Sequence, residues 1–375
     1  MNILTERSTH SGKLERWLGK EKTEELSRSM MNWYGPPIAV GGIPGNVWAC
    51  AGGDFRGRIV AGEFTNVLDW TVMRLQRIFR NASRKQQYQF NAGFASLSDL
   101  ISECTQGGKR YEFPFQKVGV TGVVGVTNSL WGLGSSPAAG ANASAAPGGD
   151  APTDATTGAF PFTNPTGGDT MHWIAGFAIA SIAGNNLLCY DRLFQVNKTM
   201  ASTATEAVTG VPARYQSTTS TDQDYIGGNF LFVEVGGTAL AATAHNWTVC
   251  LYNDQADASS TMPSLTGNSA AIVRRLDHPV GQWFAPLEAG DIGVKKLTQM
   301  QCSASVATGV INFVIGHPIA WMPCPIANTC MISDGINTAF NLVRIFDDAA
   351  LAFLEVYKGL TTATNYGGTM TCLAG

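Results

Sequence analysis

From residue 113 onward, the chain is divided into short segments rich in Val, Ile, Phe and Thr, each bounded by Gly, Asn, Asp or Pro. This pattern is typical of β-strands that are separated by turns. Helical patterns do not alternate with these segments, which argues against parallel βαβ units. The sequence therefore predicts a mainly β protein, an antiparallel β-sandwich that is jelly-roll-like. The expected strands cover residues 113–126, 172–182, 187–196, 230–235, 247–252, 294–304 and 310–315.

Alternation within two of these segments indicates half-buried strands. In 247–252, Trp, Val and Leu alternate with Thr, Cys and Tyr, and in 299–304, Gln, Gln and Ser alternate with Met, Cys and Ala. The sequence Ala307-Thr308-Gly309 follows, so we expect 294–304 and 310–315 to pair as a hairpin. Residues 350–357 fit a last strand, although 347–357 fit a helix equally well.

Residues 1–112 are expected to form a helical, loop-rich N-terminal extension, and residues 113–375 the β-sandwich domain. The clearest helix covers residues 66–80. Its apolar face consists of Leu68, Val72, Leu75 and Phe79. Its opposite face is basic and consists of Arg74, Arg77, Arg80 and Arg84, with Lys85 following. Because Arg suits phosphate and carboxylate geometry, this face is a candidate contact for nucleic acid or an acidic partner; the alternative is a solvated helix face.

A second N-terminal group is apolar and lies among Gly- and Pro-rich turns. It consists of Met30, Met31, Trp33 and Trp48. Because the turns make this segment too irregular for a core of its own, we expect these side chains to be assembly contacts with neighbouring copies.

Residues 134–170 differ in composition from everything around them. Thirty of these 37 residues are Gly, Ala, Ser, Thr or Pro, and the only charges are Asp150, Asp154 and Asp169. Such a segment lacks the apolar side chains for a core of its own, so we expect a long surface loop or a linker.

Charge is sparse and uneven along the chain. Charged residues make up 14% and hydrophobic residues 45%, and the net charge is −3. Residues 1–120 carry 16 Lys and Arg against 11 Asp and Glu, a balance of +5, and the rest carry 9 against 17, a balance of −8. The N-terminus has no basic region followed by an apolar core, and the longest largely apolar run, 173–183, is too short to span a bilayer. We therefore expect neither a Sec-type signal nor a membrane partner.

Motifs for catalysis and metal binding are weak. The common nucleotide, hydrolase and zinc-protease motifs are absent, the five histidines are scattered, and the eight cysteines lack metal-ligand spacing. The dipeptide Asp277-His278 fits half of an acid–base pair or, alternatively, a polar loop before a proline. Cys189, Cys250 and Cys302 are expected to be buried free thiols, whereas Cys324 and Cys330 are close enough in sequence to pair under oxidising conditions.

Two loops contain oxygen ligands of the kind that calcium prefers. The candidates are Asp222 and Asp224 in one loop and Asn253, Asp254 and Asp257 in the other. Their spacing is not that of an EF-hand, and Asp and Asn are also favoured in turns for backbone reasons. We therefore expect no metal or other cofactor and a chain that is not an enzyme.

Several segments in combination resemble a group of tailed-bacteriophage and prophage virion structural proteins, which are head-associated and have a jelly-roll-like C-terminal part. The resemblance covers about residues 187–323. It rests on Leu-Leu-Cys-Tyr-Asp-Arg-Leu-Phe at 187–194, Pro-Ala-Arg-Tyr at 212–215, Phe-Val-Glu-Val at 232–235, Thr-Val-Cys-Leu-Tyr-Asn at 248–253 and Leu-Glu-Ala-Gly-Asp-Ile-Gly-Val at 287–294. The long spine helix of the usual tailed-phage shell fold has no counterpart in the sequence, which favours a jelly-roll subunit.

The resemblance implies a subunit that forms or decorates a capsid shell through contacts with its own copies. The implied partners are copies of itself and other virion proteins, with non-specific contact to packaged DNA through the basic face, and the implied location is the virion, assembled in the host cytoplasm. The alternative is a lectin-like glycan-binding sandwich or a tail or receptor-binding component, which would expose clustered aromatics or carboxylates.

Overall fold

The computed structural model describes residues 39–40, 43–44, 94, 97–106, 108–217, 227–335 and 342–375. The chain divides into two compact units, 1–89 and 90–375. In the first, β1 (Ala39–Val40) pairs with β2 (Ile43–Pro44) in antiparallel fashion. The basic face, the four N-terminal assembly contacts and the Asp222 and Asp224 pair all lie outside the described residues.

The second unit is mainly β, with antiparallel sheets throughout its described residues. One helix of this unit is α6 (Leu97–Gln106). Its longer strands are β3 (Arg110–Val118), β6 (Met171–Ala180), β7 (Asn185–Lys198), β9 (Phe230–Val235), β10 (Asn246–Asp254), β13 (Val294–Cys302), β14 (Ile311–Cys324), β17 (Leu351–Val356) and β18 (Asn365–Ala374). Its shorter strands are β4 (Asn128–Ser129), β5 (Ser135–Ser136), β8 (Glu206–Ala207), β11 (Ser259–Thr261), β12 (Leu265–Thr266), β15 (Met331–Asp334) and β16 (Arg344–Ile345).

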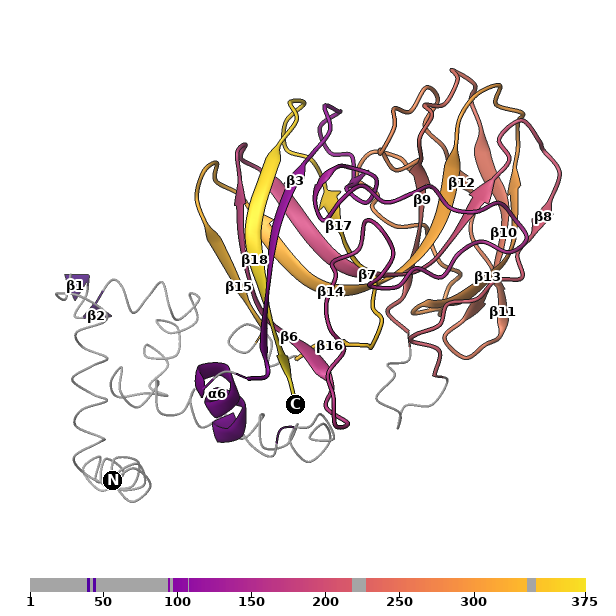
Figure 1. The fold of residues 1–375 in the computed structure, drawn as a ribbon. Coiled ribbons are helices and arrows are strands. Elements are labelled where there is room, and N and C mark those ends of the chain that lie inside the picture. The colour runs from indigo at the N-terminus through magenta and orange to yellow at the C-terminus, as the bar shows by residue number, and fades with distance from the viewer. Residues whose placement is uncertain are drawn as a thin grey trace, which may run out of the picture. The chain divides into compact units, whose positions relative to one another are not determined.

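These strands form three sheets (Figure 1). The central sheet has the order β4-β17-β7-β14-β9. A six-stranded sheet has the order β15-β6-β18-β3-β5, with β16 also pairing with β6. The third sheet has the order β11-β10-β13-β8, with β12 also pairing with β10. In Figure 1, β7 and β14 run from the side of β3, β6 and β18 to the side of β10 and β13, so both outer sheets pack against the same two strands.

One face of the central sheet carries two hydrophobic cores next to each other. Leu187 and Cys189 of β7 belong to the core that Phe115, Trp173 and Met370 of the six-stranded sheet complete. Further along the same strand and on the same face, Phe194 and Val196 belong to the core of the third sheet, with its Trp247, Leu297 and Met300. The strands β7 and β14 are 14 residues long because each must span both cores.

The opposite face of the central sheet packs against loops. Leu188, Tyr190 and Phe232 lie there under Trp131 and Leu276. Since both faces of β7 are covered, its side chains are buried almost without interruption, including the polar side chains of Asp191, Arg192 and Gln195.

Register shifts bend β7 and β14 where they pass between the two cores. One shift lies between Ile315 and Gly316 and another between Pro318 and Ala320. At Gly316 a Cβ atom would lie 2.7 Å from the Tyr190 ring, so the bend requires glycine. The bend brings two charged residues, Asp191 and Arg192, to full burial.

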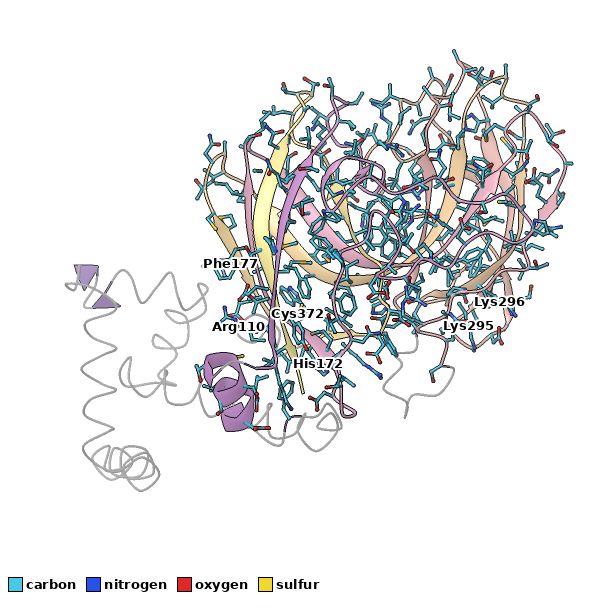
Figure 2. All side chains as sticks on the ribbon, viewed as in Figure 1. Arg110, His172, Phe177, Lys295, Lys296 and Cys372 are labelled. Atoms are coloured by element: carbon cyan, nitrogen blue, oxygen red, sulfur yellow. The ribbon has the colours of Figure 1, made fainter. Side chains whose placement is uncertain are left out.

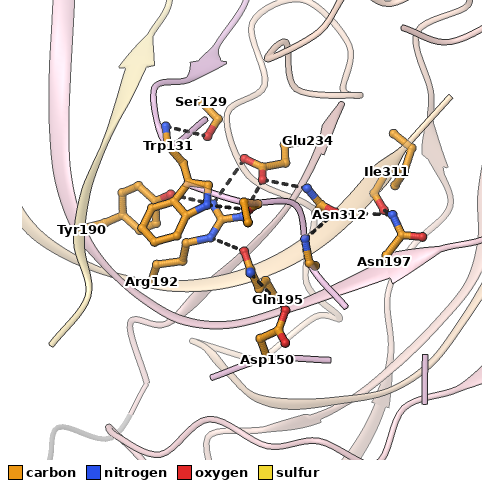
Figure 3. A network of polar contacts seen from close by, with 12 residues as sticks. Ser129, Trp131, Asp150, Tyr190, Arg192, Gln195, Asn197, Glu234, Ile311 and Asn312 are labelled. Atoms are coloured by element: carbon orange, nitrogen blue, oxygen red, sulfur yellow. Dashed lines mark hydrogen bonds and ion pairs between the residues drawn. The ribbon is translucent and has the colours of Figure 1, made fainter. Parts of the chain in front are cut away.

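The Arg192 side chain is the centre of a buried polar network on the loop-covered face (Figure 3). Its guanidinium is paired with Glu234, and its Nε donates to Gln195 Oε1 at 2.8 Å. Asn312 Nδ2 donates to the same Glu234 carboxylate at 3.1 Å. Burial alone would raise the pKa of Glu234, but the Arg192 charge holds it below its ordinary value. The pair is therefore ionised and fully enclosed.

The Asp191 side chain faces the two cores and forms a second ion pair. Arg214 Nε and Nη2 each donate to its carboxylate at 2.8 Å, and the Ala350 amide donates at 2.9 Å. A third buried pair joins Lys358 Nζ to Glu355 at 3.0 Å near the end of β17. The first two pairs join segments that are distant in sequence, whereas Glu355 and Lys358 are three residues apart.

The strand positions predicted from the sequence are largely confirmed, including β9 at 230–235, and the ambiguous segment 350–357 is a strand. The predicted hairpin between 294–304 and 310–315 is wrong. The strand β13 pairs with β10 and β8, whereas β14 pairs with β7 and β9. The intervening chain bonds elsewhere, through Val306 to Met200 and Val310 to Thr238, so it crosses between sheets.

Residues 134–170 lie against the sheets, with little regular structure of their own. Lys117 Nζ donates to Leu133 and Pro137 carbonyls at 2.9 and 2.6 Å. Asp150 accepts hydrogen bonds from Ser144 and from Gln195, which connects the segment to the Arg192 network. Phe160 is buried in the core of the six-stranded sheet. The segment therefore contributes both to a core and to the buried polar network.

Replacing Glu234 with Ala should lower the free energy of unfolding by about 3–5 kcal/mol, because it leaves the Arg192 charge buried without a carboxylate. The matched control is Glu112→Ala, which breaks an exposed pair with Arg110 worth about 0–1 kcal/mol. Urea denaturation of both variants measures the difference. Equal losses in the two variants would contradict the structural role of the network.

Candidate assembly surface

His245 and Asp277 form a buried pair beside the third sheet. This pair resembles part of a catalytic group, but all of its polar atoms are engaged within the protein. His245 Nε2 lies 2.8 Å from Asp277 Oδ2, and its Nδ1 lies 2.9 Å from the Thr243 carbonyl oxygen. Both nitrogens face oxygen acceptors. Burial opposes a charge on the ring, but the hydrogen bond and the charge of Asp277 raise the pKa of His245 above its ordinary value. Trp247 Nε1 and the Asn268 amide also donate to Asp277. The hydrogen bonds of His245 and Asp277 therefore hold the surrounding loops together, and neither ring nitrogen is left to act on a substrate.

The dipeptide Asp277-His278 does not form an acid–base pair of its own. Asp277 pairs with His245, and His278 Nε2 accepts a hydrogen bond from the Val233 amide at 2.9 Å. His278 therefore lies beside the outer edge of β9, whose backbone also bonds with Arg275 and Asp277. The polar-loop interpretation fits this geometry better.

The candidate calcium loop at 253–257 lies at the end of β10. Asp254 Oδ1 accepts from the Ala256 and Ala258 amides, both at 2.8 Å, as in an ordinary turn. Asp257 accepts from Asn253 and lies 3.6 Å from both Lys295 and Lys296, which Figure 2 labels on β13. The hydrogen bond from Asn253 and these two lysines lower the pKa of Asp257. Two cationic neighbours oppose a cation at this loop, and no metal-binding group is found among the described residues.

The cysteines in the described residues are free. Cys189, Cys250 and Cys302 are fully buried, as predicted. Cys324 is buried and Cys330 is exposed, and no disulfide joins them.

An exposed apolar area, which we call the apolar surface, lies beside the end of the central sheet where β17 and β14 finish. It consists of Val123, Val124, Val280, Phe284, Trp321 and Tyr357, with exposed fractions between 36% and 62%. Trp321 projects from β14, and the other five lie in loops or directly after β17.

Hydrogen bonds and contacts between aromatic rings join the loops of the apolar surface to one another. The Gly281 amide donates to the Gly125 carbonyl at 3.0 Å, and Tyr357 Oη donates to the Gly281 carbonyl at 2.8 Å. The half-buried Trp283 ring lies 4.7 Å from the Phe284 ring and 5.4 Å from the Trp321 ring, both edge-on. The loops that carry the six exposed side chains are therefore joined to one another by hydrogen bonds and ring contacts.

The apolar surface is free of charge over long stretches of chain. Residues 118–126, 279–287 and 318–326 contain no Asp, Glu, Lys or Arg. The nearby charges, Glu355 and Lys358, are paired with each other and fully buried. Depletion of charge together with exposed aromatic rings is the compositional signature of the centre of a protein interface.

Sequence reasoning missed this surface. It singled out apolar residues in the N-terminal segment, which lies outside the described residues, and assigned no role to residues 280–286. The available signal was the combination of charge-free loops with Val, Phe and Trp at positions where turns normally carry polar residues.

Comparison with known proteins identifies no relative. No family model, no curated protein and no solved structure matches the chain. Among the described residues, no helix has the length and apolar character needed to cross a membrane.

The three neutral buried histidines should make the fold sensitive to mild acid. Burial lowers the pKa of His172 and His278 to about 4 and that of His317 to about 3. In the unfolded chain they bind protons near pH 6.5, so the unfolded state gains protons first and stability falls as the pH drops from 6.5 towards 4.5. His245 does not add to this loss, because its pKa is raised in the folded state, so its contribution to stability is retained at low pH and is lost only as the pH rises.

Thermal unfolding followed by circular dichroism between pH 4.5 and 7 measures this slope. His317→Phe keeps a ring against Tyr215, where the two rings now stack at 3.9 Å, and removes one titrating group. We expect a shallower dependence in that variant than in the wild type. An unfolding temperature that does not change between pH 6.5 and 4.5 would contradict the assignment.

Proposed function

We propose that this chain is a non-enzymatic structural subunit that assembles with copies of itself. The observation that carries the proposal is the distribution of polarity: Arg192, Asp191 and Lys358 are paired inside, while Val280 and Trp321 are exposed on a charge-free surface. Leaving such a surface in water is unfavourable, by about 25 cal/mol for each Å² of apolar area, so contact with another copy is stabilising.

We also propose that the three antiparallel sheets form a double, jelly-roll-like β-sandwich in which the two outer sheets share the central sheet. Each core lies between the central sheet and one outer sheet. The buried ion pairs Asp191–Arg214, Arg192–Glu234 and Glu355–Lys358 stabilise the central sheet and the segments packed against it. A rigid layered subunit suits a lattice, because repeated contacts require that every copy has the same shape.

We further propose that the assembly is a phage capsid shell that this chain forms or decorates, made in the host cytoplasm. The support is the resemblance of residues 187–323 to phage virion proteins, and that segment contains the buried ion pairs Asp191–Arg214 and Arg192–Glu234. Other virion proteins and packaged DNA are the further partners of the proposal, with DNA assigned to the basic face at residues 74–85.

Replacing Val280 with Lys should prevent assembly, because it places a charge at the centre of the apolar surface. The matched control is Val211→Lys, since Val211 is 52% exposed and lies outside this surface. Light scattering coupled to size-exclusion chromatography should show large species for the wild type and the control and small species for Val280→Lys. If both variants assemble equally well, the apolar surface is not the contact between copies.

A second candidate function is glycan binding, favoured by the exposed rings of Trp321 and Phe284. Sugars stack on exposed aromatic faces, and Trp321 is 43% exposed beside the edge of Trp283. If this function holds, Trp321→Ala should abolish binding on a glycan array while Val211→Lys retains it. A wild-type chain that binds no glycan on the array would exclude this candidate and leave assembly.

A further inference from the structure

A buried lysine and a buried asparagine meet on one carboxylate where β4 pairs with β17. Glu355 lies directly opposite Asn128 in this antiparallel pairing. Asn128 Nδ2 donates to Glu355 Oε2 at 2.7 Å, and Lys358 Nζ donates to Glu355 Oε1 at 3.0 Å. All three residues are 0% exposed. An amine and a carboxamide are therefore separated only by the two oxygens of a single carboxylate.

Residues 119–122 lie against this group and bring a second indication that the two side chains are neighbours. A Cβ atom at Gly122 would lie 3.6 Å from Lys358 Cδ and 3.9 Å from Asn128 Nδ2, so both side chains pass beside the same point of the backbone. The Gly122 amide donates to the Thr361 carbonyl at 2.8 Å, which fixes the segment in this place. The amine and the carboxamide are therefore held side by side and away from solvent.

The Asn128 carbonyl is the exceptional atom of the group. Its Oδ1 is buried and has no hydrogen-bond partner among the described residues. Buried polar atoms are nearly always paired, so an orphan calls for an explanation, and a part in chemistry is one such explanation. The atoms around it are engaged: Tyr366 Oη donates to Glu355 Oε1 at 2.6 Å, and Lys358 Nζ lies 3.4 Å from Thr364 Oγ1.

We propose that Lys358 and Asn128 join in an intramolecular isopeptide bond, with Glu355 as the group that moves the protons. Burial disfavours separated charges, so transfer of one proton from Nζ to the carboxylate is easier here than in water and gives a nucleophilic amine. One oxygen of Glu355 faces the amine that must lose a proton, and the other faces the amide nitrogen that must gain one. This inference concerns the covalent structure of a single chain and does not depend on the proposed self-assembly.

The reaction conserves atoms and needs no other reactant. Nζ gives one proton to Glu355 and attacks Cγ of Asn128, so the Nζ–Cγ bond forms while the C=O electron pair moves to Oδ1. Glu355 passes this proton to Nδ2 and accepts a second one from Nζ. The carbonyl forms again as the Cγ–Nδ2 bond breaks, and its electron pair leaves with nitrogen as ammonia, which takes the second proton from Glu355. The product closes a covalent ring of residues 128–358, which restricts the unfolded chain as a disulfide does.

The mass of the purified full-length chain tests this bond directly. Measured under denaturing conditions, it should be lower than the mass of the unmodified chain by one ammonia, about 17 Da. Trypsin cleaves after Lys and Arg, so the bond should join peptide 118–192 to peptide 345–375, without cleavage at the blocked Lys358. An unmodified mass after long incubation of the folded chain, or a lost ammonia that maps to another residue, would overturn the proposal.

The variant Glu355→Gln tests the role of the carboxylate, because the amide keeps its size but does not take a proton from Nζ. We expect the joined peptide to appear at least about a hundredfold more slowly. The matched control is Lys198→Arg, since Lys198 is also buried and paired with a glutamate, Glu206, at 2.6 Å; it should lose ammonia as the wild type does.

Circular dichroism shows whether each variant is folded. A folded Glu355→Gln variant that forms the bond at the wild-type rate would contradict the part assigned to Glu355. If that variant does not fold, the wild-type mass and its tryptic peptides decide the question alone. A negative result leaves the proposed self-assembly unaffected.

Discussion

The ion pairs of Asp191 and Arg192 with Arg214 and Glu234 are the interactions on which the rest of this structure depends. They occupy the point where β7 passes from one core to the other, and adjacent side chains on a strand point to opposite faces. Asp191 therefore joins Arg214 between the two cores, and Arg192 joins Glu234 under the loops. Each charge costs several kcal/mol to bury unless it is paired, so only this arrangement of strands and loops is compatible with them.

Two consequences follow for the parts of the molecule around the central sheet. Residues 134–170, which have little apolar surface, are held through Asp150 and Gln195 at the edge of the Arg192 network. Asp191, Arg192, Glu355 and Lys358 are charged residues that are buried in pairs, whereas the apolar surface carries no charge over long stretches. The proposed contact with further copies rests on this distribution.

The sequence predicted local structure well and long-range pairing poorly. The strand 230–235 was visible because it is rich in Phe and Val and its ends are marked by Asn and Gly. The hairpin prediction failed because turn residues such as Gly309 specify a reversal of the chain without specifying which strand receives it. Helix α6 was missed although Leu97, Leu100 and Cys104 have helical spacing, and the partners of Asp191 and Arg192 lie 23 and 42 residues away, beyond any local pattern.

Electron microscopy of the purified full-length chain in negative stain tests the central claim most directly. The account predicts that concentrated protein forms closed rings, shells or sheets of regular spacing, without any other component. Dispersed particles of the size of one 39.8 kDa chain at every concentration would contradict it.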